Sequence, residues 1–157
     1  MADQYDLTPH ERVEIVSREP SALVAIASYG SGGSAPPNHL HPAQDERFEV
    51  LAGTLTVDRD GAQETLSVGA EITVARGTPH RMWNADPATE ARVRWTTTPA
   101  GRTEDWWRAL ADARAGRDRP PPHRALPLLR EYRDVFRLVA PGPAAPVVGA
   151  VLGYRRG

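Results

Sequence analysis

Between residues 12 and 98 the sequence is a succession of short apolar runs that are separated by Gly, Pro and Asp. This spacing is typical of consecutive antiparallel strands, and no helical periodicity competes with it. Asp60-Gly61 falls between two such runs and predicts a hairpin turn, because Gly adopts a positive φ without strain. The predicted strands are Arg12–Ser17, Ala22–Ser28, His39–His41, Arg47–Val57, Glu64–Ser67, Glu71–Ala75, Arg81–Asn84 and Ala91–Thr97. Many short strands at this spacing favour an all-β fold, a jelly-roll β-barrel.

The pattern changes after Pro99, where helical spacing replaces strand spacing. Thr103, two acidic residues and then WWRALADARAG predict a helix with Thr103 as its N-cap and Gly116 beyond its end. The segment RDRPPPH is predicted to be a stiff linker that cannot be helical. A second, amphipathic helix is predicted in RALPLLREYRDVFRLVA, whose apolar residues recur at helical spacing at Leu129, Tyr132, Phe136 and Val139.

These two patterns divide the chain into a barrel domain at residues 1–100 and a helical extension at residues 101–157. We expect the helices to pack on or beside the barrel and to cover one face of it. A lid over the barrel mouth and a dimerisation surface are the alternatives. The tail APVVGAVLGYRRG is apolar enough to need cover as well.

Composition and charge narrow the range of partners. A formal net charge of -1, from 19 basic and 20 acidic residues, creates no field that would concentrate nucleic acid or acidic membranes. The absence of Cys means that imidazole and carboxylate groups must hold any metal, and the absence of Lys excludes Schiff-base chemistry. The start is polar and acidic, without a secretory pattern, and no stretch approaches the roughly 20 apolar residues of a membrane span. We therefore expect a cytoplasmic protein with no nucleic acid and no membrane as partner. We also expect a small-molecule substrate or ligand and a homodimer.

Two histidines, His39 and His41, stand one residue apart on a predicted strand. They project to the same face, with Cα atoms about 7 Å apart, and can aim at one point inside a barrel. Pro42 ends this strand, and Glu46 opens the next one, from which its carboxylate can reach the same point. His80 follows the turn RGTP that would start a neighbouring strand. Three neutral nitrogens and one carboxylate oxygen suit one divalent transition metal (Fe, Mn, Co, Ni or Zn) without selecting among these ions, and no other cofactor is expected.

The arrangement of these residues resembles the two motifs of the cupin superfamily. The first motif matches at every fixed position, and the second at all but Ala75, where the family has Pro. The matching residues are Gly33, His39, His41, Glu46 and Gly53 in the first motif and Gly69, Gly77, His80 and Asn84 in the second. The resemblance implies a small single-domain bacterial cupin, a cupin_2-like barrel with a helical C-terminal extension, whose metal is held by three His and one Glu.

The alternation of side chains along a strand also predicts which residues line a pocket beside the ligands. Phe48 shares the face of Glu46, Met82 shares the face of His80, and Trp95 is a further candidate for the wall, although filling the barrel core is an equal alternative for all three. An apolar wall around a metal favours a carbon-rich or aromatic substrate that offers oxygen atoms to the metal. The catalytic residue is unknown; Tyr29 is the candidate proton donor, with an ordinary half-buried strand tyrosine as its alternative.

Other polar residues are assigned no role at the metal. Arg47 and Glu49 have the opposite parity to Glu46 and are expected to be a solvated or intersubunit pair. His10 and His123 lie in polar or Pro-rich segments and are expected to be exposed to solvent.

Three functions remain open at this point. The first is a metal-dependent enzyme of dioxygenase type, which the resemblance to cupins suggests. The second is a non-redox isomerase, lyase or cyclase, in which the metal polarises a carbonyl and a side chain moves a proton. The third is a ligand-binding barrel without turnover, which the lack of a visible helix-turn-helix disfavours. Fold does not choose among the three functions.

Overall fold

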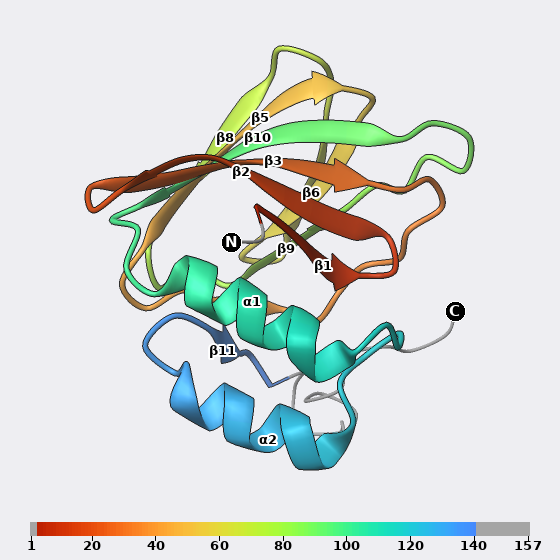
Figure 1. The fold of residues 1–157 in the computed structure, drawn as a ribbon. Coiled ribbons are helices and arrows are strands. Elements are labelled where there is room, and N and C mark those ends of the chain that lie inside the picture. Colours follow the sequence, from red (N-terminus) through yellow and green to blue (C-terminus); the bar gives the residue numbers. More distant parts are fainter. Residues whose placement is uncertain (1–2, 141–157) are drawn as a thin grey trace.

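Two antiparallel sheets face one another in the computed structural model, which describes residues 3–140 (Figure 1). The six-stranded sheet has the order β1 (Gln4–Thr8), β2 (Glu11–Glu19), β3 (Ala22–Tyr29), β10 (Ala91–Thr98), β5 (Asp45–Ala52) and β8 (Glu71–Val74). The five-stranded sheet has the order β11 (Arg137–Leu138), β4 (His39–Leu40), β9 (His80–Trp83), β6 (Leu55–Arg59) and β7 (Ala62–Leu66). The predicted all-β jelly-roll fold, with helices only after Pro99, is confirmed.

Strict alternation of burial along β3, β5 and β10 builds the interior between the sheets. On β5, Glu46, Phe48 and Val50 point inward, and on β10 the inward residues include Trp95 and Thr97. The sequence left the inward face of β3 undecided, and the structure buries Leu23, Ala25, Ala27 and Tyr29. Small alanines on β3 leave room opposite the larger side chains of β5 and β10.

One predicted strand, Arg47–Val57, is wrong. The chain leaves the six-stranded sheet after Ala52, turns at Gly53 and enters the other sheet at Leu55. Gly53 has φ +71°, a conformation that non-glycine residues adopt only with strain. β1 was also not predicted from the sequence. Buried Tyr5 and Leu7 alternate with polar residues in this strand, but the segment was interpreted as a polar start of the chain.

We expect Gly53→Ala to destabilise the protein by about 3 kcal/mol or more, since a left-handed residue and a steric clash coincide there. An added Cβ would lie 2.5 Å from the Glu90 carbonyl oxygen and 2.9 Å from the Ala91 Cα, both of them backbone atoms. Gly69 also has a positive φ, of +85°, but open space around its Cβ position. Gly69→Ala is therefore a matched control, and urea unfolding should show a loss of only about 1–2 kcal/mol. Equal losses in the two variants would contradict the role of the clash.

The first helix, α1 (Thr103–Arg114), begins where it was predicted but is capped differently. Arg102 occupies the N-cap position, and the Thr103 hydroxyl is buried without a hydrogen-bond partner among the described residues. At the other end Ala115 is left-handed, and Gly116 follows with φ +77°. This end agrees with the prediction that the helix stops before Gly116.

The second helix differs more from its prediction. α2 (Pro122–Glu131) begins inside the segment that was predicted to be non-helical, because Pro at the first helical position lacks only a donor that would be unpaired anyway. It ends at Glu131, so Tyr132, Phe136 and Val139 lie beyond it. The chain instead turns back to the barrel, where β11 pairs with β4 and Val139 N–H donates to the Asn38 carbonyl. Pairing with an open strand edge therefore overrides the local helical periodicity.

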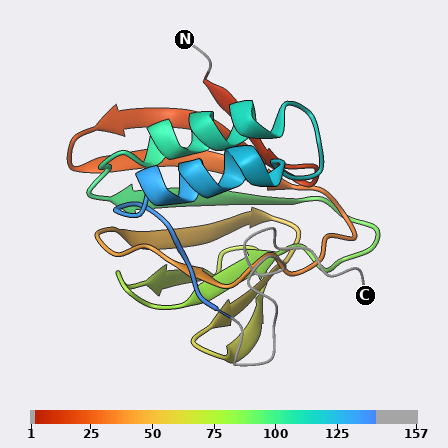
Figure 2. The ribbon, with the colours of Figure 1, turned by 90° about the horizontal axis from the view of Figure 1, so that it is seen from below.

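Both helices lie against one end of the barrel, with α1 between the sheets and α2 (Figures 1 and 2). Trp106 and Trp107 of α1 are buried in the same core cluster as the barrel residues. The rings of Trp107 and Trp95 meet edge to face, with centroids 4.8 Å apart. Within residues 3–140, no helix is long and apolar enough to cross a membrane. The predicted apolar tail lies outside the described residues.

Candidate metal centre and its cavity

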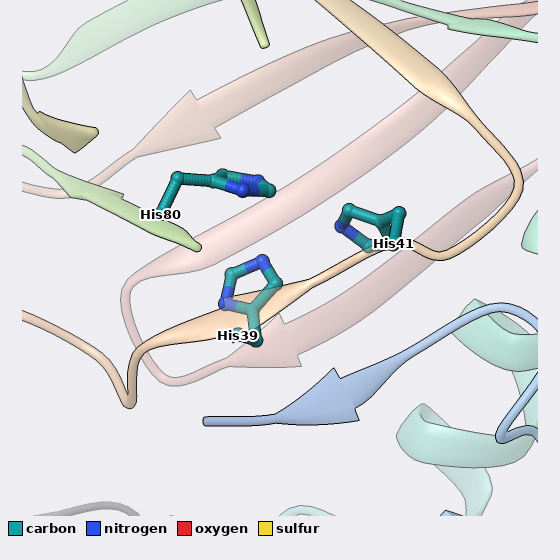
Figure 3. Close-up of side chains that lie close together, drawn as sticks. All are labelled: His39, His41 and His80. Carbon is teal, nitrogen blue, oxygen red and sulfur yellow. The ribbon is translucent and has the colours of Figure 1, made fainter. Parts of the chain in front are cut away.

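The three motif histidines converge inside the barrel (Figure 3). His39 lies on β4, directly opposite His80 on β9, and His41 follows β4 in the chain. One ring nitrogen of each can be chosen so that all three lie within 4.8 Å of one another. His41 and His80 are buried, and His39 is half-buried. The cluster is therefore a group of histidines that could hold a metal ion.

Backbone carbonyls orient all three imidazole rings. Nδ1 of His39 lies 3.1 Å from the Pro37 oxygen, and Nδ1 of His80 lies 2.8 Å from the Thr78 oxygen. Nδ1 of His41 lies 2.7 Å from the oxygen of Val135, a residue of the C-terminal extension. Because a carbonyl can only accept, each Nδ1 is assigned as the protonated nitrogen. In its neutral form each ring then presents the lone pair of Nε2, which is the arrangement that metal-binding histidines use.

Glu46 reaches the same point from β5. Its two carboxylate oxygens lie 2.9 Å from Nε2 of His80 and 3.3 Å from Nε2 of His41. Two ligand atoms that bind one ion at about 2.1 Å and at right angles are about 3.0 Å apart, so both distances fit adjacent ligands. Nε2 of His41 is buried without a hydrogen-bond partner among the described residues. A lone pair that faces a buried carboxylate needs a cation between the two groups, and the residues present therefore fit a metal ion.

Trp95 has a second role that the sequence reading missed. Its indole N–H donates to Glu46 at 3.0 Å, in addition to the contribution of its ring to the cavity wall. Trp95 shares its inward face with Thr97, which is directly opposite Glu46 in the strand register. A buried tryptophan on a strand beside an inward carboxylate could have suggested this hydrogen bond, because buried indole N–H groups find acceptors.

Electrostatics at the cluster favour the neutral forms of His39 and His41 and the ionised form of Glu46. Burial, together with the neighbouring histidines, holds the pKa of His39 well below its usual range. Burial also lowers the pKa of His41, against the opposing charge of Glu46. For His80 burial is the largest single effect and opposes protonation, but the hydrogen bond with Glu46, the charge of Glu46 and the Thr78 carbonyl together outweigh burial and raise the pKa of His80. Neutral imidazole is the form that binds a metal.

A cavity of about 180 Å³ opens beside the cluster, between the barrel and the extension. Phe48, Met82 and Trp95 are among its lining residues, as are Tyr29 and the histidines. The extension closes it with apolar side chains: Trp106, Trp107, Leu110, Leu128, Leu129 and Phe136. Phe136 stacks on His39 with ring centroids 4.8 Å apart. Both parts of the chain thus line the site.

The residues assigned no role at the metal lie elsewhere. His10 and His123 are exposed. Arg47 and Glu49 point away from the interior and do not pair with one another: Arg47 forms an ion pair with Glu71, and Glu49 forms one with Arg94 at 2.6 Å.

Glu11 is a cavity residue that the sequence reading did not single out. It opens β2 directly opposite Tyr29 on β3, and both residues line the cavity. Burial of its carboxyl group raises the pKa of Glu11 to about 7, with a further contribution from the charge of Glu46 and a lowering one from Tyr29. The Tyr29 hydroxyl is buried and makes no hydrogen bond of regular geometry with the described residues. Burial and the charge of Glu11 raise the pKa of Tyr29 well above its usual value.

This raised pKa predicts a pH-dependent stability difference for Glu11→Gln. Between pH 4.5 and about 7 the folded protein holds a proton on Glu11 that the unfolded chain releases, so stability falls as pH rises through this window. The other titratable or charged residues that line this cavity are Tyr29, His39, His41, Glu46, His80, Arg114, Asp118 and Arg119. The stability of the variant relative to wild type should increase from pH 5 to pH 8, by up to about 2 kcal/mol after allowance for partial exposure.

Urea unfolding of both proteins in the presence of a chelator measures this difference. Glu14→Gln, at an exposed position on the same strand, is the control and should show a flat difference. A flat profile for Glu11→Gln would show that its carboxyl group is solvated.

Comparison with known proteins agrees with the barrel fold. Residues 25–97 match the Cupin_2 family model, described as the cupin domain. The fold is similar to that of KdgF from Halomonas sp., with a TM-score of 0.58 and 21% identity over 66% of this chain and 93% of that chain. It is also similar to an RmlC-like cupin from Shewanella frigidimarina, with a TM-score of 0.57 and 17% identity over 64% and 86% of the two chains. Residues 25–97 therefore form a cupin domain, and its three-histidine group could hold a metal ion.

Two curated relatives share a shorter stretch of sequence. An oxidoreductase of Arthrobotrys oligospora is 40% identical over 59 residues, which cover 37% of this chain and 23% of the relative. The oxidoreductase iacF of Pestalotiopsis fici is 38% identical over 64 residues, which cover 40% of this chain and 31% of the relative. The chain therefore spans less than a third of the length of these two relatives.

Proposed function

We propose that this protein is a metal-dependent enzyme of dioxygenase type that acts on a small apolar or aromatic substrate bearing oxygen. The observation that carries the proposal is the convergence of three carbonyl-oriented histidines and Glu46 at the wall of a largely apolar cavity. His39, His41, Glu46 and His80 would hold one divalent ion, Fe, Mn, Co, Ni or Zn. The oxidoreductase names of the two partial relatives support redox chemistry.

The chain's own residues would bind the substrate, orient it and exclude water. When bound, the ion supplies Lewis acidity and, if it is redox-active, electron exchange with O₂. Phe48 and Met82 offer an apolar surface to the carbon skeleton, and Phe136 and Trp107 close the cavity from the extension. Trp95 holds Glu46 in place through its indole N–H, which leaves the carboxylate oriented toward the histidines.

A second candidate function is a non-redox isomerase, lyase or cyclase. The specific observation in its favour is Glu11, whose raised pKa of about 7 suits a group that exchanges a proton near neutral pH. Glu11 and Tyr29 line the same cavity as the histidines, so a proton could move between them and a bound substrate. In this case the ion would polarise a carbonyl of the substrate and no O₂ would be consumed.

Metal analysis and oxygen consumption test the proposal. The protein is purified under mild conditions, its metal content is measured, and O₂ uptake is followed with a panel of phenolic and diketone compounds. We expect uptake that requires the metal and is lost in His80→Ala. Metal-dependent conversion without O₂ uptake, with solvent deuterium entering the product and loss of that exchange in Glu11→Gln, would establish the second candidate instead. Binding without turnover would leave a ligand-binding cupin.

The oligomeric state stays a separate proposal. We propose a homodimer, and sedimentation velocity at micromolar concentration would test it directly. A single species with the mass of one 17.1 kDa chain would contradict it.

A further inference from the structure

Arg114 is the one buried Lys or Arg within residues 3–140, with 5% of its surface exposed. It lies in the last turn of α1, and Trp107, Leu110 and Arg114 follow one another at spacings of three and four residues. This spacing places all three on one face of the helix, which is the face that lines the metal cavity. A cation therefore occupies a position where the helix otherwise presents apolar side chains to the cavity.

The contacts of Arg114 satisfy only part of its guanidinium group. Nε donates to the carbonyl of Arg117 at 2.7 Å, and Nη1 donates to the carbonyl of Asp6 at 2.7 Å. A guanidinium has five N–H donors, and Nη2 has no acceptor among the described residues. Both acceptors are neutral carbonyls, so these hydrogen bonds fix the position of the guanidinium group but do not compensate its positive charge.

No carboxylate of the described residues forms an ion pair with Arg114. Asp6 is near enough for Arg114 to lower its pKa, but its carboxylate pairs with Arg12 at 2.7 Å. Asp118 and Arg119 also line the cavity, where both are exposed and carry opposite charges. Residues 1–2 and 141–157 contain no Asp or Glu. Burying an unpaired cation is unfavourable, so a position of this kind is typical of a site whose anion arrives with a ligand.

We infer that Arg114 binds a carboxylate of the substrate, whose apolar or aromatic body fills the rest of the cavity beside the metal. This inference rests on the proposed function, because it assigns the substrate class of the same cavity. A single buried guanidinium compensates one negative charge and matches the two oxygens of a carboxylate. A phosphate dianion would bring more charge than this apolar wall compensates. The substrate is then an acid that offers one end to Arg114 and another to the metal.

Paired ligands test this inference without knowledge of the reaction. Benzoate, phenylacetate and 3-phenylpropionate, each beside its neutral amide, are titrated calorimetrically into metal-loaded protein and into protein treated with EDTA. Metal content is measured in every sample, so that failure of the metal site is recorded separately from failure of Arg114. We expect at least one acid to bind about 10- to 100-fold more tightly than its amide.

Arg114→Gln should remove this preference and leave metal content unchanged. Arg130→Gln makes the same change in charge on the extension, at an exposed position away from the cavity, and should keep the preference. Arg114→Lys retains the positive charge but lacks the planar guanidinium group, so it should keep a reduced preference for the acid. This variant tests the inference if Arg114→Gln does not fold. The inference is overturned if no acid is preferred over its amide. It is equally overturned if the preference survives in Arg114→Gln and disappears with EDTA, which would mean that the acids bind the metal.

Discussion

Replacing His80 with Ala is expected to strip most of the metal from the purified protein and to weaken rebinding by at least about 100-fold. His80 is buried, its Nδ1 is already committed to the Thr78 carbonyl, and its Nε2 faces Glu46 at 2.9 Å. The variant removes one of the three nitrogens and leaves the Glu46 carboxylate buried without that partner. Elemental analysis and titration with Fe(II), Mn(II) and Zn(II) measure the loss, and His41→Ala should behave in the same way.

His123→Ala and His10→Ala are the controls for this experiment. Both residues are exposed and distant in sequence from the motifs, and their removal should leave metal content unchanged. Full occupancy in His80→Ala would mean that the metal site has been assigned to the wrong residues.

Glu46→Gln is expected to weaken metal binding by about 10- to 100-fold, because it removes the single anion of the ligand set and retains the size of the side chain. Glu46 is 1% exposed, and Trp95 donates to one of its oxygens. An amide in this position can accept from the indole N–H with its oxygen and donate its NH₂ group to a histidine lone pair, so the variant removes the negative charge and keeps these hydrogen bonds. We therefore expect Glu46→Gln to reduce metal affinity more than it reduces the stability of the barrel.

Glu49→Gln is the matched control, three residues further along the same strand. Its carboxylate faces outward and pairs with Arg94 at 2.6 Å. We expect metal affinity to stay within about twofold and stability to change by less than about 1 kcal/mol. Metal affinities of both variants are measured under identical conditions. A larger effect in Glu49→Gln would mean that the register of β5 is shifted by one residue.

The extension takes part in the metal centre as well as covering the barrel. Val135 supplies the carbonyl that orients His41, Phe136 stacks on His39, and β11 adds a strand beside β4. Changes in how this segment packs would therefore alter ligand geometry and cavity volume together. For the extension we predicted a cover for the barrel, with a lid over the barrel mouth as an alternative. The two roles are compatible, because the same residues line the cavity and hold a ligand in place.

The barrel, the convergence of its three motif histidines and the inward face of β5 could be predicted from the sequence because they depend on local rules and on the two motifs. Strand alternation puts Glu46, Phe48 and Val50 on one face whatever the neighbouring strands are. The spacing of His39, His41 and His80 matches a known pair of motifs, and turns such as Asp60-Gly61 depend on a conformation that few residues adopt. These features depend on residues close together in the sequence or on two motifs of fixed spacing, so the sequence by itself determined them.

Only the tertiary structure decided which distant groups meet. Glu11 and Arg114 are ordinary polar residues in the sequence, and they line the cavity because β2 opens beside Tyr29 and the last turn of α1 faces the barrel. The periodicity after Leu129 predicted a longer helix, but pairing of β11 with β4 made a strand there and brought Val135 to His41. The physical reason is that burial and strand-edge hydrogen bonds between remote segments outweigh helix propensity, which amounts to less than about 1 kcal/mol for an ordinary residue.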